Sequence, residues 1–340
     1  MDPAILFFLF GVFAGLIKSN LEIPAPIAKF LSLYLLMAIG LKGGFALAES
    51  GLTREVVVTL SCALGLAFAV PLMGYAVLRR FLNGFDAAAV AATYGSVSAV
   101  TFITAMQFLD THGVAYGAHM AAAMALMESP AIFLGVLLAN QARKKAHALL
   151  APPGGPTPPA RATGAAAATG GAPAPSTGLG KVLHEALTDG AQLLLMGAMA
   201  VGLLSGSAGQ SAMQPFAVDL FKGMLAFFLL DMGLLVARNL GGLRESSWWL
   251  VAYAVLGPLV HATLALAVSV AFGLSAGNAA LLMVLAASAS YIAVPAVVRH
   301  AIPEAKPSLY FGMSLGLTFP FNILLGIPLY STVAQKVLGA

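Results

Sequence analysis

The chain has 340 residues, of which 60% are apolar and only 9% carry a charged side chain. A soluble domain carries about a quarter charged residues, so this chain lacks the polar surface that water requires, and we expect an integral membrane protein. The net charge of +4 comes from basic residues spread over many loops. Without a basic patch, nucleic-acid binding is not expected.

Ten apolar segments predict ten membrane-spanning α-helices, since a spanning helix needs about 20 apolar residues. Leu, Ala, Met and Phe dominate them, without the roughly ten-residue alternation of a membrane barrel strand. The predicted spans are residues 3–17, 27–47, 56–77, 87–109, 116–141, 182–204, 216–237, 248–272, 278–298 and 307–333. The first is short, so we expect it to lie peripherally or to thin the bilayer. Asp2 stands where a signal peptide has basic residues, so we expect this segment to be retained.

A stretch rich in Ala, Pro and Gly divides the spans into two sets of five. Residues 152–180 contain no aromatic and no β-branched apolar residue, so burial there cannot offset the entropy of ordering. The sequence therefore predicts a first five-helix unit (residues 1–141), a flexible cytoplasmic linker (142–180) and a second five-helix unit (181–340).

The basic residues predict the orientation. Thirteen Lys and Arg residues lie on the side that the chain reaches after its odd-numbered spans, and four lie on the other. Since cytoplasmic loops carry the excess of Lys and Arg, the linker is expected in the cytoplasm and both termini outside it.

Three pairs of similar motifs stand about 190 residues apart. They are GLTRE (51–55) with GGLRE (241–245), YGSVSAV (94–100) with AASASYI (286–292), and MESPAIFLGV (127–136) with LTFPFNILLGI (317–327). Each unit holds an odd number of spans, so the second copy enters the membrane upside down. Inverted repeats of this kind are frequent in secondary transporters.

The fourth and ninth spans carry small and polar residues at their centres, which suggests that both helices break there, near Gly95–Ser98 and Ala287–Ala293. A broken helix leaves backbone groups that only protein or a wet cavity can satisfy, and its half-helix N-terminus attracts anions. Close helix packing explains either run alone better, but matched positions in both repeats favour a binding site. The candidate substrate-binding residues are Gly95, Ser96, Ser98, Ser288, Ala289, Ser290 and Tyr291.

Oxygen-bearing side chains near the same depth suggest a cation site, since hard cations prefer oxygen ligands. Glu128 is central in its span, where an ionisable group costs about 2.5–3.5 kcal/mol and is expected to face the protein interior. Pro130 and Pro320 each free a backbone carbonyl at matching positions. The candidate cation-binding residues, for Na⁺, are Thr101, Glu128, Thr318 and Asn322. Asp231 is a further buried acid, for which a binding role and an interhelical hydrogen bond are equally good interpretations.

Enzyme motifs are not found. The lone Cys62 excludes a disulfide framework within the chain, and the six histidines lack metal-ligand spacing. Nothing resembles a P-loop or a nucleophile elbow, so we expect neither an enzyme nor an organic cofactor.

The chain resembles the sodium-dependent bicarbonate transporter family of the SbtA type. The stretches that carry the resemblance are IPAPIAKFLSLYLLMAIGLKGG (23–44), YGSVSAVTFITAMQFLD (94–110), ALMESPAIFLGVLLAN (125–140), LLDMGL (229–234), AASASYIAVPAVVRHAIPEAKPSLYFG (286–312) and TFPFNILLGIPLY (318–330). The similarity covers nearly the whole chain except the linker.

The resemblance implies a homotrimer in the lipid of a bacterial inner membrane. It also implies a scaffold of spans one, two, six and seven, and an elevator-like core that holds bicarbonate and Na⁺ at Ser96, Ser98, Thr101, Ser288 and Ser290. A PII-like cytoplasmic regulator would follow too, although the Ala/Pro-rich linker departs from the family pattern.

The expected function is sodium-coupled symport of a small monovalent anion, with bicarbonate as the first choice. Two alternatives stay open: a sodium- or proton-coupled carrier of a small organic carboxylate, with Glu128 as the proton carrier, and a membrane sensor that binds its anion without moving it.

Overall fold

The computed structural model describes residues 3–51, 53–150, 190–239 and 247–339, and every regular element in these ranges is a helix. The prediction of a helical protein is confirmed over this part of the chain. The first half contains α1 (Pro3–Leu16), α2 (Ala25–Ser50), α3 (Arg54–Leu78), α4 (Gly84–Gly95), α5 (Ala99–Thr111) and α6 (Met120–Leu150).

The second half contains α8 (Gly190–Gln214), η1 (Pro215–Asp219), α9 (Phe221–Asn239), α10 (Trp248–Phe272), α11 (Ala276–Ala287), α12 (Ala293–Ala301), α13 (Pro307–Phe311), η3 (Gly312–Thr318), α14 (Phe319–Phe321), η4 (Asn322–Gly326) and α15 (Ile327–Leu338). The η segments are π-helical. Two of them flank Pro320, which cannot donate a backbone hydrogen bond and so displaces the normal ladder.

One boundary differs from the sequence prediction. Residues 142–150, assigned to the linker, continue helix α6 as far as Leu150. Ala, Arg and Lys, which make up most of this extension, form helices readily, and basic residues near a helix C-terminus interact favourably with its dipole. The rest of the predicted linker, residues 151–180, lies outside the described residues.

The described residues contain seven stretches long and apolar enough to cross a membrane, and two shorter apolar helices, α1 and α11. One of the seven covers 49 residues, 190–238, or about 74 Å of straight helix at 1.5 Å per residue. A bilayer core is only about 30 Å thick. The stretch is not one straight helix, because its backbone is non-helical at Gly206 and the π-helical turn η1 lies between α8 and α9. The chain is therefore a multi-pass membrane protein.

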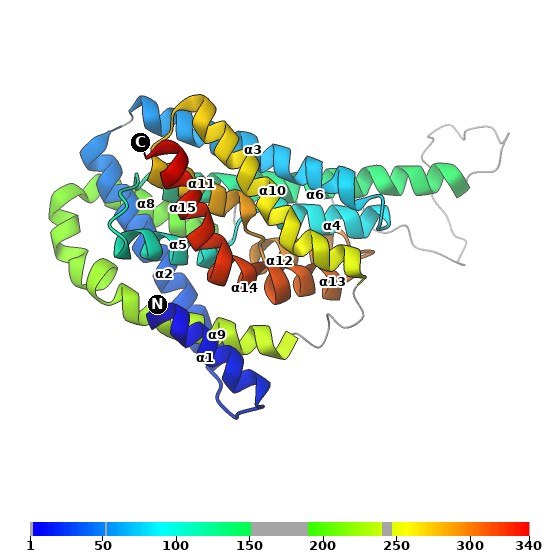
Figure 1. The fold of residues 1–340 in the computed structure, drawn as a ribbon, viewed down its shortest axis with the longest axis horizontal. Helices are drawn as coiled ribbons and strands as arrows, with labels where there is room; N and C mark the ends of the chain where they lie inside the picture. The colour runs from blue at the N-terminus through cyan, green and yellow to red at the C-terminus, as the bar shows by residue number, and fades with distance from the viewer. Residues whose placement is uncertain (1–2, 52, 151–189, 240–246, 340) are drawn as a thin grey trace, which may run out of the picture.

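The helices form two packing groups. In one, α1 lies against α9 and α2 lies against α8 (Figure 1). Glycines allow both contacts, because a Cβ at Gly11 or Gly233 would collide with the backbone of the partner helix, as would one at Gly44 or Gly202. Small residues permit such close backbone approach between membrane helices. We call α1, α2, α8 and α9 the paired group.

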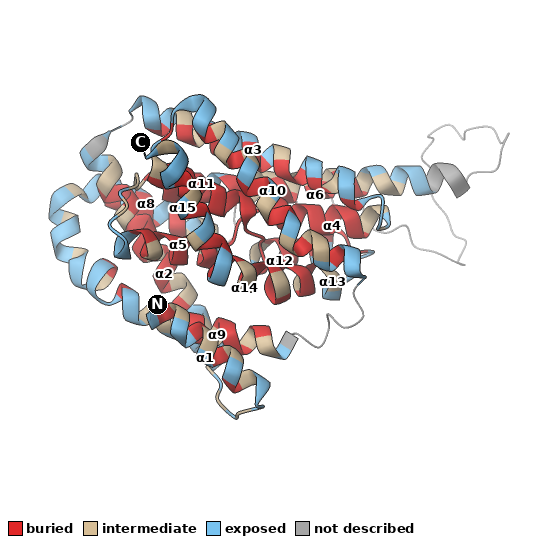
Figure 2. Ribbon diagram, viewed as in Figure 1, coloured by how far each residue is buried: buried red, intermediate tan, exposed pale blue. Residues whose placement is uncertain are grey.

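The other group consists of α3 to α6 and α10 to α15, and we call it the core group. Within it, α3 packs on α4 and α6, and α10 packs on α11. The stretch Gly84–Thr111 is 94% buried over its most apolar part, against 33% for α10. Figure 2 shows the same contrast, with α4, α5 and α11 largely buried and α3 and α10 exposing many residues. The helices that enclose α4 and α5 thus shield them from lipid.

An ion pair joins the end of α6 to the loop between α12 and α13. Arg143 Nε donates to Glu304 Oε1 and Arg143 Nη2 donates to Glu304 Oε2, each at 2.7 Å. Arg143 also donates to the Ala301 carbonyl at 2.9 Å. This two-pronged contact ties the two halves of the core group together at one end.

The pair predicts a pH dependence of stability. The hydrogen bonds from Arg143 hold the pKa of Glu304 below its ordinary value of 4.5. A lowered carboxyl pKa stabilises the fold above the ordinary value, and this contribution is lost as the pH falls through the lowered pKa. Glu304→Gln is therefore expected to destabilise the protein by about 0.2–1 kcal/mol near pH 7 and to match the unmodified protein well below about pH 4. Thermal unfolding in detergent measures this, and an equal gap at both pH values would contradict it.

Candidate functional site

Two helical stretches are interrupted inside the core group. Helix α4 ends at Gly95 and α5 begins at Ala99, while α11 ends at Ala287 and α12 begins at Ala293. Both interruptions were predicted at these positions. The residues between the half-helices are buried, except for Ile292.

The two breaks hydrogen-bond to each other. The Ser98 amide donates to Ser288 Oγ at 2.9 Å, and the Ser290 amide donates to the Thr93 carbonyl at 2.8 Å. Each break therefore provides a hydrogen-bond partner for a backbone amide of the other break, which lipid could not provide. The amides of Ser98 and Ser290 already have protein partners, so other groups must bind a ligand.

Serine side chains organise the second half-helix at both breaks. Ser98 Oγ accepts hydrogen bonds from the Thr101 amide at 3.2 Å and from the Thr101 hydroxyl at 2.9 Å, and so caps α5. Ser290 Oγ accepts one from the Val294 amide at 3.3 Å, in the first turn of α12. Because the first amides of a helix have no partner within it, the first turn of α5 still offers the Ala99 and Val100 amides.

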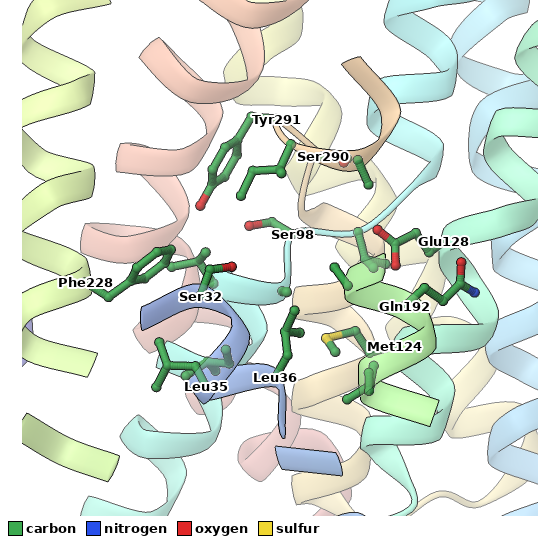
Figure 3. A pocket seen from close by; sticks show the side chains of 18 residues that line it. Ser32, Leu35, Leu36, Ser98, Met124, Glu128, Gln192, Phe228, Ser290 and Tyr291 are labelled. Carbon is green, nitrogen blue, oxygen red and sulfur yellow. The ribbon is translucent and has the colours of Figure 1, made fainter. Parts of the chain in front are cut away.

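A pocket with a volume of about 60 Å³ lies where the breaks face the paired group (Figure 3). Helices α2, α6, α8 and α9 contribute the remaining walls. The polar side chains in the lining are Ser32, Ser98, Glu128, Gln192, Ser290 and Tyr291. Most other lining residues are apolar, a mixture typical of sites for small molecules.

Four of the predicted residues meet in this lining: Ser98, Glu128, Ser290 and Tyr291. The other predicted residues of the breaks lie just outside it. Those residues are Gly95, Ser96, Thr101, Ser288 and Ala289.

Packing accounts for Gly95, because a Cβ there would come within 2.7 Å of three Pro71 side-chain atoms. Ser96 is different, because its hydroxyl is buried without a hydrogen-bond partner among the described residues. A buried polar atom without a partner is costly, so a bound ion or water near Ser96 would satisfy it.

Thr318 and Asn322 do not reach the pocket lining. The Thr318 hydroxyl lies 2.6 Å from the Tyr94 hydroxyl and donates to the Ala254 carbonyl at 2.7 Å. Asn322 Nδ2 donates to the Ala287 carbonyl at 2.8 Å, at the end of α11. Both side chains hold the half-helices from behind, and the structure does not bring them together with Glu128 in the lining.

Sequence reasoning missed the wall that the paired group contributes. Ser32 on α2, Gln192 on α8 and Phe228 on α9 line the pocket. Ser32 and Gln192 are isolated polar residues in the apolar stretches FLSLYL and AQLLLM, a signal that could have found them. Asp231, one turn after Phe228, does not line the pocket.

The donor set is that of a hard cation and not of a transition metal. No group of three His, Cys, Asp or Glu residues suited to a metal exists in the described ranges. Hydroxyls, carbonyls and the Glu128 carboxylate provide oxygen atoms, the ligands that Na⁺ shares with Ca²⁺ and Mg²⁺. The oxygen atoms at the breaks therefore suit a hard cation such as Na⁺.

Comparison with known proteins identifies the family. A family model described as the Na⁺-dependent bicarbonate transporter superfamily matches residues 3–335, nearly the whole chain. A search of curated proteins finds no match. With its family model covering both breaks and the pocket between them, the chain belongs to the Na⁺-dependent bicarbonate transporter superfamily.

Proposed function

We propose that the protein is a secondary transporter that carries bicarbonate together with Na⁺ across the membrane. The observation that carries the proposal is the pair of crossed helix breaks, which share one pocket with Glu128 in a chain of this superfamily. As in other transporters, such breaks bring half-helix ends and backbone carbonyls to a site within the membrane.

The anion site uses the N-termini of α5 and α12. A half-helix N-terminus contributes about 0.3–1 kcal/mol toward an anion, and up to about 2 kcal/mol when partly buried. The oxygens of bicarbonate accept hydrogen bonds from the Ala99 and Val100 amides and from the hydroxyls of Ser98 and Ser290. These four residues all line the pocket.

The cation site uses Glu128 and the carbonyls and hydroxyls at the breaks. Thr101, Thr318 and Asn322 do not line the pocket and hold the neighbouring helices in place by hydrogen bonds. A tenfold inward Na⁺ gradient supplies about 1.4 kcal/mol per ion. One Na⁺ with one bicarbonate is electroneutral, so each additional cation would add about 2.3 kcal/mol per 100 mV of membrane potential.

The proposal includes ten spans in two inverted repeats, and reciprocal contacts support it. Gly202 follows Gly11 by 191 residues and Gly233 follows Gly44 by 189, and the contacts α1–α9 and α8–α2 exchange these positions. Inverted copies that pack on each other produce such exchanged pairs.

A second pair of contacts shows the same exchange. Asp86 near the start of α4 accepts from the Lys306 amide at 2.8 Å, and Asn278 near the start of α11 accepts from the Gly117 amide at 2.7 Å. Asn278 follows Asp86 by 192 residues, and Lys306 follows Gly117 by 189. Each repeat thus fixes the chain before the last span of the other.

The pocket lies between the paired group and the core group, so a displacement of the core group would carry the ions from one membrane face to the other. We propose this elevator-like movement, with both termini outside and the linker in the cytoplasm of a bacterial inner membrane. Homotrimeric assembly and a PII-like cytoplasmic regulator stay predictions from the family resemblance.

The test is uptake of labelled bicarbonate by proteoliposomes that contain the purified protein. An inward Na⁺ gradient is expected to raise the initial rate at least tenfold over a choline gradient, because choline cannot fit an oxygen site built for Na⁺. A sodium ionophore should abolish the difference. Equal rates in Na⁺ and choline would overturn sodium coupling, and no uptake in either would overturn bicarbonate as the substrate.

The pocket position of Glu128 also favours a second candidate, a carrier of a small organic carboxylate coupled to Na⁺ or to protons. A proton-coupled carrier would give uptake that is independent of Na⁺ and rises steeply as the external pH falls. Competition by a panel of small carboxylates, at fixed bicarbonate and fixed pH, separates the two substrates.

A further inference from the structure

Hydrogen bonds join α8 of the paired group to α6 of the core group at the rim of the pocket. Gln192 lies in the first turn of α8, and its Nε2 donates to the Ala125 carbonyl at 3.1 Å and to Ser129 Oγ at 2.9 Å. The Ser129 hydroxyl also lies 3.1 Å from Gln192 Oε1, to which it can donate. Because a carbonyl can only accept, Ala125 fixes which end of the amide is nitrogen.

This contact lies beside the proposed cation ligand. Ala125 and Ser129 are four residues apart and therefore lie on one face of α6, and Glu128 directly precedes Ser129. Gln192 and Glu128 both line the pocket, at the edge shown in Figure 3. The amide of Gln192 thus fixes the turn of α6 that presents Glu128.

The contact also crosses the boundary between the two packing groups. Helix α8 packs mainly on α2, whereas α6 packs mainly on α3 and α4. Both ends of the Gln192 amide bond to α6, so a relative displacement of the groups must break these hydrogen bonds together.

We propose that Gln192 is a positioning residue that latches α6 to α8 in the conformation seen here and must release when the core group moves. This inference rests on the movement proposed above. Loss of the latch lowers the ratio of the present conformation to the displaced one by about threefold to tenfold, which corresponds to the net value of one protein hydrogen bond.

Cysteine labelling tests the latch without measuring transport. Ile292 lines the pocket and is 53% exposed, so Ile292→Cys is introduced after Cys62→Ala removes the native thiol. A membrane-impermeant maleimide is then applied to sealed vesicles of either orientation. Gln192→Ala and Ser129→Ala are each expected to speed labelling from the side to which the pocket is closed, relative to labelling from the side to which it opens, by about threefold or more.

Two matched variants serve as controls. Ser129→Thr keeps the hydroxyl and is expected to label at the rate of the parent. Gln210→Ala removes an exposed amide from the same helix, α8, and is expected to leave both rates unchanged. If Gln192→Ala does not fold, the comparison of Ser129→Ala with Ser129→Thr decides the question.

Unchanged labelling from both sides in folded Gln192→Ala and Ser129→Ala would overturn the latch. The outcome is separate from the proposed substrate, because labelling that shifts in a protein that moves no bicarbonate would reject the substrate and keep the latch.

Discussion

Glu128→Gln is expected to lower Na⁺-driven bicarbonate uptake at least tenfold. The substitution keeps the shape of the side chain but removes the negative charge from the pocket wall, where Glu128 lies with Ser98 and Ser290. A cation taken from water into the membrane must exchange its hydration shell for protein oxygens, and a formal negative charge strengthens that exchange most. The loss should be greatest at low Na⁺ concentration.

The initial rate of labelled uptake, measured over a range of Na⁺ concentrations, checks this prediction. Glu49→Gln is a suitable control, because Glu49 is an exposed carboxylate near the end of α2. A folded Glu128→Gln protein with an unchanged half-saturating Na⁺ concentration would remove Glu128 from the cation site.

The sequence was informative about the breaks because polarity is costly inside a membrane. Serine residues at the centre of an apolar run are unfavourable in lipid, and two such runs stand about 190 residues apart, in 94–100 and 286–292. The repetition indicates a shared role. The ends of α4, α5, α11 and α12 therefore lie close to the predicted positions. Glu128 could be placed near the site for the same energetic reason.

The sequence was less informative about which side chains face which neighbour. Thr318 and Asn322 have the oxygen atoms of cation ligands, yet Thr318 donates to Ala254 of α10 and Asn322 donates to Ala287 at the end of α11, and neither lines the pocket. That outcome depends on the π-helical turns η3 and η4, which rotate residues away from the faces that a regular helix would give them.

The wall formed by the paired group could not be derived from either break. It exists because α2, α8 and α9 pack against the core group. The isolated polar residues Ser32 and Gln192 mark these helices as candidates, but the sequence does not say which helices they face. Gln192 of α8 illustrates the point, since it donates hydrogen bonds to Ala125 and Ser129 of α6, which precede it by 67 and 63 residues. The pocket residues at the breaks and Glu128 were thus predictable from sequence, whereas the residues of α2, α8 and α9 required the fold.

The hydrogen bonds at the crossing also limit how the site can bind an anion. Ser98 and Ser290 are predicted substrate-binding residues, but their amides donate to Ser288 Oγ and to the Thr93 carbonyl. What remains for an anion is the first turn of each second half-helix and the serine hydroxyls. The crossing is therefore a rigid support, and binding falls to the groups that face the pocket.

Ser98→Ala and Ser290→Ala are each expected to lower the rate of bicarbonate uptake by up to about tenfold. The double variant is expected to lower it further than either single variant. Each substitution removes a hydroxyl from the pocket and a hydrogen-bond acceptor from the first turn of a half-helix. Ser98 accepts from the Thr101 amide as the N-cap of α5, and Ser290 accepts from the Val294 amide of α12. The missing ligand hydrogen bond costs about 0.5–1.5 kcal/mol of binding, whereas the lost contact to the half-helix costs about 1 kcal/mol of folding stability. The ligand hydrogen bond alone therefore accounts for a loss of uptake of up to about tenfold.

Initial rates of uptake in proteoliposomes, at matched protein content, measure the effect. Ser61→Ala is the control, because the Ser61 hydroxyl is exposed on α3 and donates to its own helix, to the Val57 carbonyl. Thermal unfolding in detergent should show only the small loss of a cap, so a large fall in uptake with a small fall in stability identifies the hydroxyls as ligands. Unchanged uptake in both variants would show that the Ser98 and Ser290 hydroxyls, which line the pocket, do not bind the anion.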